Sequence, residues 1–60
     1  MKGNLLIIDD EQVLADNLKQ LIRKYADQVY VANNGIEGLE ILRKHEIHCV
    51  VSDVYMPEMN

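Results

Sequence analysis

Three aspartates that directly follow, or lie one residue beyond, apolar segments carry the side chains best suited to chemistry. Asp9 and Asp10 come after the apolar run at residues 5–8, and Asp53 comes after residues 49–52. Carboxylates brought within a few ångströms of one another repel, so a proton or a cation must offset their charge. Because these ligands are all oxygens, a hard cation is favoured, and Mg²⁺ suits a site with few carboxylates, several waters and a phosphate oxygen.

A carboxylate can also accept a phosphoryl group, a reaction that needs in-line geometry and positive charge near the phosphoryl oxygens. Asp53 is the candidate nucleophile, because it stands alone at the end of its segment and the loop after it leaves space for a donor. We expect Asp10 to bind the metal directly and Asp9 to act through water or to position the ion. An Asp-Asp-Glu sequence is also common at a helix start, so the prediction depends on both segments together.

Alternating strand and helix patterns are expected to position these aspartates. Residues 5–8 form a continuous apolar run, typical of a strand buried on both faces of a parallel sheet. From Glu11 to about Tyr25, apolar residues recur at spacings of three and four, which predicts an amphipathic helix. We expect its core face to consist of Leu14, Leu18, Leu21, Ile22 and Tyr25.

The rest of the chain repeats this alternation. Residues 29–32 are rich in β-preferring side chains and predict a second strand, and Asn33-Asn34-Gly35 supplies a turn and a helix N-cap. A second helix is predicted over residues 36–45, and a third strand over residues 49–53.

Strand, helix, strand, helix, strand in this order predicts an α/β fold with a parallel sheet and right-handed crossovers. The first strand then lies between the other two, with one helix covering each face. Ligands of such sheets bind beyond the carboxyl ends of the strands, where all three aspartates fall. The third strand would be an edge without charged residues, and such an edge tends to recruit another strand. We therefore interpret the chain as half of a larger sheet.

Composition argues against several classes of function. The net charge is −4, and no cluster of Lys and Arg is present, so direct binding of nucleic acid is not expected. The run at residues 5–8 is too short for a membrane span or a signal peptide, and a cytoplasmic location is the expectation. Cys49 is the only cysteine and is expected to be a small buried hydrophobe.

The sequence resembles the receiver domain of bacterial two-component response regulators over all 60 residues. The resemblance rests on three segments, Leu6-Ile7-Ile8-Asp9-Asp10-Glu11, Ala32-Asn33-Asn34-Gly35-Ile36-Glu37-Gly38-Leu39 and Ser52-Asp53-Val54-Tyr55-Met56-Pro57-Glu58-Met59-Asn60. It implies a flavodoxin-like βαβαβ half-domain whose three-stranded parallel sheet has the order 2-1-3.

The resemblance also implies a set of roles. A sensor histidine kinase or a phosphotransfer protein would phosphorylate Asp53, and the chain would be a phosphoacceptor and not an enzyme. Mg²⁺ would be held by Asp9, Asp10, Asp53 and the backbone carbonyl of Tyr55. Residues 1–60 would be the N-terminal half of a receiver domain, ending before the fourth strand. The Ser or Thr hydroxyl and the Lys that later strands supply would be missing, and phosphorylation is expected to be impaired.

Two other hypotheses compete with the phosphoacceptor. The first is a non-signalling half-domain that acts as a structural or binding module and dimerises through its exposed third strand; we expect the isolated chain to be a homodimer. The second is a dinucleotide-binding enzyme, but the Gly-x-Gly-x-x-Gly turn is missing after the first strand, and Gly35 and Gly38 fit turn and packing roles better. His45 and His48 are expected to be exposed and not to form a metal pair.

Overall fold

The central strand of the molecule is the apolar run near the start of the chain. The computed structural model describes residues 3–52. In chain order, the elements are β1 (Asn4–Ile8), α1 (Gln12–Ile22), β2 (Gln28–Ala32), α2 (Gly35–Lys44) and β3 (Cys49–Ser52). The three strands are parallel, in the order β2-β1-β3. The predicted flavodoxin-like layout is therefore confirmed.

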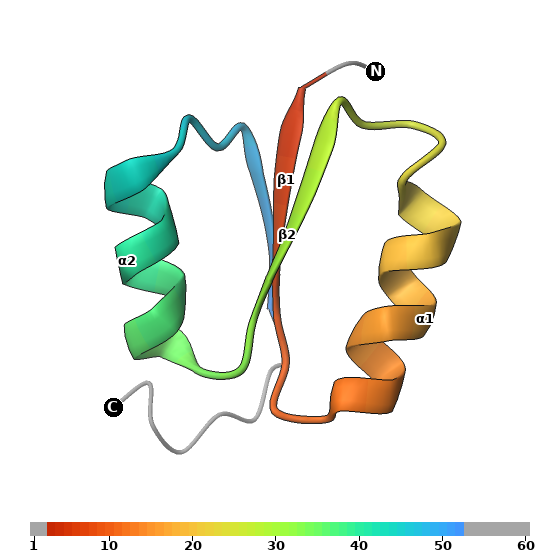
Figure 1. Ribbon diagram of the computed structural model, residues 1–60, viewed down its shortest axis with the longest axis horizontal. Helices are drawn as coiled ribbons and strands as arrows, with labels where there is room; N and C mark the ends of the chain where they lie inside the picture. Colours follow the sequence, from red (N-terminus) through yellow and green to blue (C-terminus); the bar gives the residue numbers. More distant parts are fainter. Residues whose placement is uncertain (1–2, 53–60) are drawn as a thin grey trace.

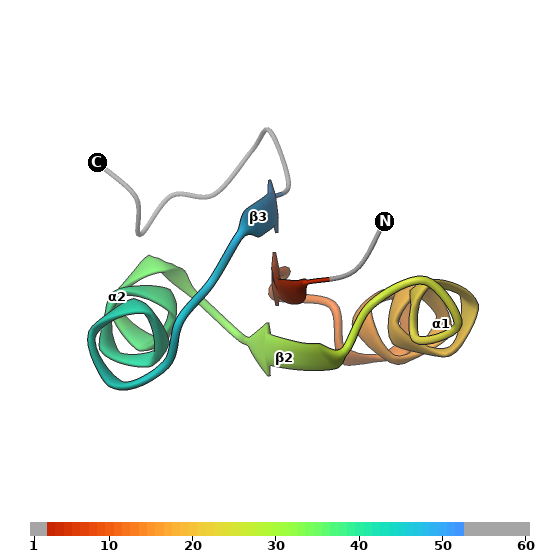
Figure 2. The same ribbon diagram turned by 90° about the horizontal axis from the view of Figure 1, so that it is seen from above.

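The two helices lie on opposite faces of the sheet, as Figures 1 and 2 show. On the α2 face, Leu6, Ile8 and Ala32 form a buried cluster, against which Tyr30 and Ile41 pack. On the α1 face, the cluster consists of Leu5, Ile7 and Ala15, with Leu18, Ile22 and Val51 among its partly buried neighbours. Because successive strand residues point to opposite faces, residues 5–8 of β1 must all be apolar to fill both clusters.

Helix α1 packs with a face that matches the expected one only at Leu18 and Ile22. Ala15, Leu18 and Ile22 contact the sheet, whereas Leu14, Leu21 and Tyr25 are exposed by 49%, 66% and 66%. The prediction that these three belong to the core is wrong. Their spacing of seven and four forms a second apolar stripe beside the first, and one sheet face can cover only one stripe. The helix also ends at Ile22, not near Tyr25, and residues 23–25 form a turn.

Helix α2 begins with reciprocal hydrogen bonds between backbone and side chains. The side chain of Asn34, the N-cap, accepts a hydrogen bond from the backbone N–H of Glu37 at 2.9 Å. The Glu37 carboxylate in turn accepts a hydrogen bond from the backbone N–H of Asn33, also at 2.9 Å. These bonds satisfy donors at the helix start and confirm the predicted turn and N-cap.

Gly38 lets α2 approach the sheet closely. A Cβ atom at position 38 would lie only 2.7 Å from Cδ1 of Ile8, closer than real Cβ contacts. The packing role expected for this glycine is therefore confirmed. The outer side of α2 carries Ile36, Leu39 and Leu42, which are exposed.

Strand β3 pairs with β1 on one side, and in the described part of the chain nothing pairs with its other side. It is thus the expected edge strand. Cys49 is exposed, so the prediction of a buried cysteine is wrong. Its place at the start of an edge strand leaves it covered from one side only. No helix within residues 3–52 is long and apolar enough to cross a membrane.

Candidate functional site

Asp9 lies in the turn that leaves β1 at the carboxyl end of the sheet and is held by two hydrogen bonds. The residue is 7% exposed. Its backbone N–H donates to the carbonyl oxygen of Ala32, 3.0 Å away, and thereby extends the pairing of β1 with β2. Its Oδ1 atom accepts a hydrogen bond from the backbone N–H of Glu11 at 2.9 Å. The backbone of Asp9 is therefore fixed by Ala32, and its carboxylate is oriented by the Glu11 amide.

Among the described residues, the backbone N–H of Glu11 makes the one hydrogen bond to the Asp9 carboxylate, and it uses Oδ1. An oxygen with negative charge and a fixed direction is the kind of ligand that a hard cation prefers.

Asp10, the next residue, is exposed, and its side chain makes no hydrogen bond to any described residue. The N-cap of α1 is Glu11, whose side chain makes no capping hydrogen bond, whereas Asp9 accepts the backbone N–H of Glu11 just before the helix. The first turn of α1 also holds no acidic residue. Asp9 and Asp10 thus place one oriented and one freely accessible carboxylate next to each other, which fits a divalent cation with oxygen ligands.

The other predicted site residues, Asp53 and Tyr55, lie outside the described residues. The register of β1 and β3 is described up to the residue before Asp53. Ile8, which precedes Asp9, is the Cα partner of Ser52, which precedes Asp53 in the sequence. Within residues 3–52, no group of three or more His, Cys, Asp or Glu side chains could hold a metal ion. The proposed convergence of three carboxylates therefore stays a prediction.

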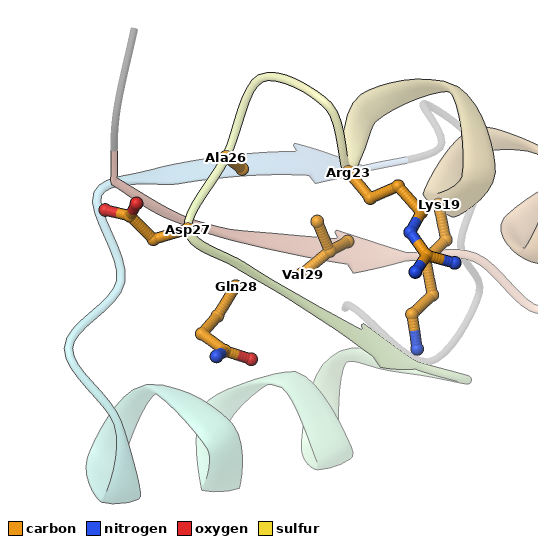
Figure 3. Close-up of a pocket in the computed structure, with 6 residues that line it drawn as sticks. All are labelled: Lys19, Arg23, Ala26, Asp27, Gln28 and Val29. Carbon is orange, nitrogen blue, oxygen red and sulfur yellow. The ribbon is translucent and has the colours of Figure 1, made fainter.

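The sequence did not indicate an open pocket of about 370 Å³ between the end of α1 and the start of β2. Figure 3 shows Lys19 of α1 and Arg23, directly after the helix, extending beside β2; the other lining residues are Ala26, Asp27, Gln28 and Val29. The pocket lies at the amino end of β2, whereas the backbone of Asp9 is bonded to Ala32 at the other end of that strand. The pocket is thus separate from the turn that carries Asp9 and Asp10.

Comparison with known proteins identifies relatives of the chain. The family model described as the response regulator receiver domain matches residues 5–60. A response regulatory protein of Staphylococcus epidermidis is 34% identical over 59 residues, which cover 93% of this chain and 24% of that protein. The transcriptional regulatory protein HptR of Staphylococcus aureus is 32% identical over 59 residues, which cover 93% of this chain and 23% of HptR.

The chain thus spans about a quarter of the length of these relatives. No solved structure matches it significantly.

Proposed function

The chain belongs to the family of response regulator receiver domains, the phosphoacceptor modules of two-component signalling, and from this premise we propose that Asp53 is its phosphoacceptor. Mg²⁺ is held by Asp9, Asp10, Asp53 and the backbone carbonyl of Tyr55. The phosphoryl donor is a sensor histidine kinase or a phosphotransfer protein. In this proposal the chain receives the phosphoryl group and is not itself an enzyme.

The observation that carries this proposal is the parallel register of β1 and β3. Ile8 and Ser52 are Cα partners, and each is followed in the sequence by one of the candidate aspartates, Asp9 and Asp53. Adjacent parallel strands end at the same edge of a sheet, where α/β proteins bind their ligands. This register supports a shared site for the two carboxylates.

The chemistry divides among the residues of the chain. An oxygen of Asp53 attacks the phosphorus of the donor phosphohistidine; the new O–P bond forms as the N–P bond breaks, and the imidazole nitrogen keeps the electron pair. Bound Mg²⁺ supplies positive charge beside the phosphoryl oxygens. Asp9, fixed by the Glu11 amide, presents its oxygen without reorganisation, and the exposed Asp10 supplies a second oxygen.

Phosphorylation of this chain alone is slow in our proposal. The family's later strands supply a hydroxyl and a Lys that contact the phosphoryl group, and residues 1–60 contain no segment corresponding to them. These groups add charge and hydrogen bonds that stabilise the transition state, so their loss lowers the rate while the nucleophile stays in place.

The test is to incubate the chain with Mg²⁺ and acetyl phosphate and to measure its intact mass. We expect a phosphoryl adduct that peptide mapping assigns to position 53 and that is lost in Asp53→Asn. Asp27→Asn, which removes another exposed aspartate, is the matched control and should keep the adduct. Failure to form any adduct, or an adduct that survives Asp53→Asn, would contradict the assignment.

A second candidate function is a half-domain that dimerises through β3 and serves as a structural or binding module. The exposure of Cys49 and of Val50, which is 45% exposed on an edge strand, favours this candidate. Sedimentation at several concentrations tests it, with Val50→Lys as the variant expected to remain monomeric. Folded monomer at every concentration would exclude it, whereas stabilisation by Mg²⁺ without an adduct would favour it over phosphoryl acceptance.

A further inference from the structure

A cluster of hydrogen bonds joins the starts of β1 and β3 at the amino end of the sheet. This end lies opposite the turn that carries Asp9 and Asp10. The backbone N–H of Asn4 donates to Nδ1 of His48 at 2.9 Å, and the backbone N–H of His48 donates to the carbonyl of Asn4 at 2.8 Å. The Asn4 side chain donates to the carbonyl of Glu46 at 2.7 Å. Three hydrogen bonds thus connect Asn4 to residues 42 and 44 positions further along the chain, and one of them uses an imidazole.

The bond from Asn4 determines the protonation state of His48. A backbone N–H is always a donor, so the Nδ1 atom that faces it must carry a lone pair and no proton. The imidazole in this arrangement is neutral, with its proton on Nε2. An imidazolium has protons on both nitrogens and would direct its Nδ1–H at the N–H of Asn4, which removes the bond and adds repulsion.

Gly3 keeps the imidazole close to the backbone. A Cβ atom at position 3 would lie 3.2 Å from Nδ1 of His48 and 3.3 Å from its Cβ atom. The φ of Gly3 is +150°, a value that residues with side chains rarely adopt. The carbonyl of Gly3 also accepts a hydrogen bond from the backbone N–H of Asp27 at 2.7 Å, which connects the start of β2 to the same cluster.

From this geometry we propose that His48 is a pH-sensitive latch: the neutral imidazole fastens β3 to β1 at the amino end of the sheet, and protonation releases it. The inference rests on the described fold and not on the proposed phosphorylation. Because β3 is an edge strand with one neighbour among the described strands, release of this end weakens the attachment of the whole strand. Histidine is the side chain that ordinarily changes charge between about pH 5 and pH 8.

The charged groups around His48 favour the two states differently. Nε2 of His48 lies 3.6 Å from Oε2 of Glu46, and the two groups form an ion pair only when the imidazole is protonated. The two side chains are 46% and 83% exposed, so water screens the attraction and Glu46 does not replace the lost bond. Asp27 joins the cluster through its backbone, and His45 is stacked on Tyr30 with ring centroids 4.5 Å apart.

Nuclear magnetic resonance of the ¹⁵N-labelled chain tests the latch directly. At neutral pH, the ring nitrogens of His48 should show Nδ1 unprotonated and Nε2 protonated. As the pH falls through the histidine range, the protection of the Asn4 amide against hydrogen exchange, corrected for the intrinsic rate, should decrease about two- to tenfold, the range expected for one hydrogen bond.

Two histidine variants separate the latch from general acid effects. In His48→Asn, an amide oxygen takes the place of Nδ1 and does not titrate, so Asn4 should stay protected at every pH. His45→Asn, the matched control, should keep the pH dependence of the parent chain.

The proposal is overturned if Asn4 protection in the parent chain does not change as His48 titrates, or if neutral His48 carries its proton on Nδ1. An unchanged pH dependence in His48→Asn would overturn it equally. The measurements on the parent chain decide the matter even if a variant does not fold.

Discussion

The carboxylate of Asp9 accepts a hydrogen bond from the backbone N–H of Glu11 at 2.9 Å, so the residue that closes β1 also orients the entry to α1. The same carboxylate therefore has a structural role and a proposed role in metal binding. Substitutions that separate its hydrogen bond from its charge distinguish the two.

Asp9→Asn retains an oxygen that can accept the Glu11 amide but removes the charge. We expect the free energy of unfolding without metal to change little, while the stabilisation by Mg²⁺ becomes weaker. Asp9→Ala removes both and should cost about 1–3 kcal/mol, because the Glu11 N–H loses its partner. Urea unfolding with and without Mg²⁺ measures both effects, and equal responses to Mg²⁺ in all three chains would exclude a metal role for Asp9.

Asp10→Asn should weaken the effect of Mg²⁺ without removing any hydrogen bond seen among residues 3–52. Without metal the variant should be as stable as the parent or slightly more stable, because one of several neighbouring negative charges is gone. Thermal unfolding over a series of Mg²⁺ concentrations checks this. Asp16→Asn, another exposed aspartate in the same region, is the control and should leave the response to Mg²⁺ unchanged.

Gly38→Ala should destabilise the chain even though alanine favours helices. The added Cβ would meet Cδ1 of Ile8 at 2.7 Å, and overpacking of this kind costs about 1–3 kcal/mol. Ile8→Val removes the atom in conflict, so the double variant should lose less stability than the sum of the two single variants. Purely additive losses in urea unfolding would show that the close approach of α2 does not depend on this contact.

Asn34→Ala should cost about 1 kcal/mol, because the N–H of Glu37 loses the side-chain oxygen that caps α2. Asn34→Asp keeps an acceptor at the same place and adds a charge that suits a helix start, so it should be neutral or stabilising. Circular dichroism during urea unfolding measures the difference. Equal stability of the alanine variant and the parent would contradict the capping role.

Leu21→Ala should have little effect on stability, within about 0.5 kcal/mol, because its side chain is 66% exposed. Leu6→Ala, by contrast, truncates a fully buried side chain and should cost about 2–5 kcal/mol. A large loss in Leu21→Ala that grows with protein concentration would show that the outer stripe of α1 is covered by a second copy.

The local sequence was sufficient to predict the structure where the interactions span only a few residues. The unbroken apolar run of β1 identified the central strand, since only a strand covered on both faces needs every position to be apolar. The cap at Asn34 and the position of Asp9 and Asp10 after β1 follow from neighbouring residues in the same way. These parts of the fold were predicted correctly, whereas the roles of Asp9 and Asp10 in the site stay predictions.

The tertiary structure decided which surfaces are covered. Helix α1 has two apolar stripes of similar composition, and its packing on the sheet buries Ala15 and partly buries Leu18 and Ile22, while Leu21 and Tyr25 stay exposed. Cys49 is exposed because β3 lies at an edge, and the bond between Asn4 and His48 joins residues 44 positions apart. Burial and long-range hydrogen bonds depend on which elements lie next to each other, and no pattern within a single segment carries that information.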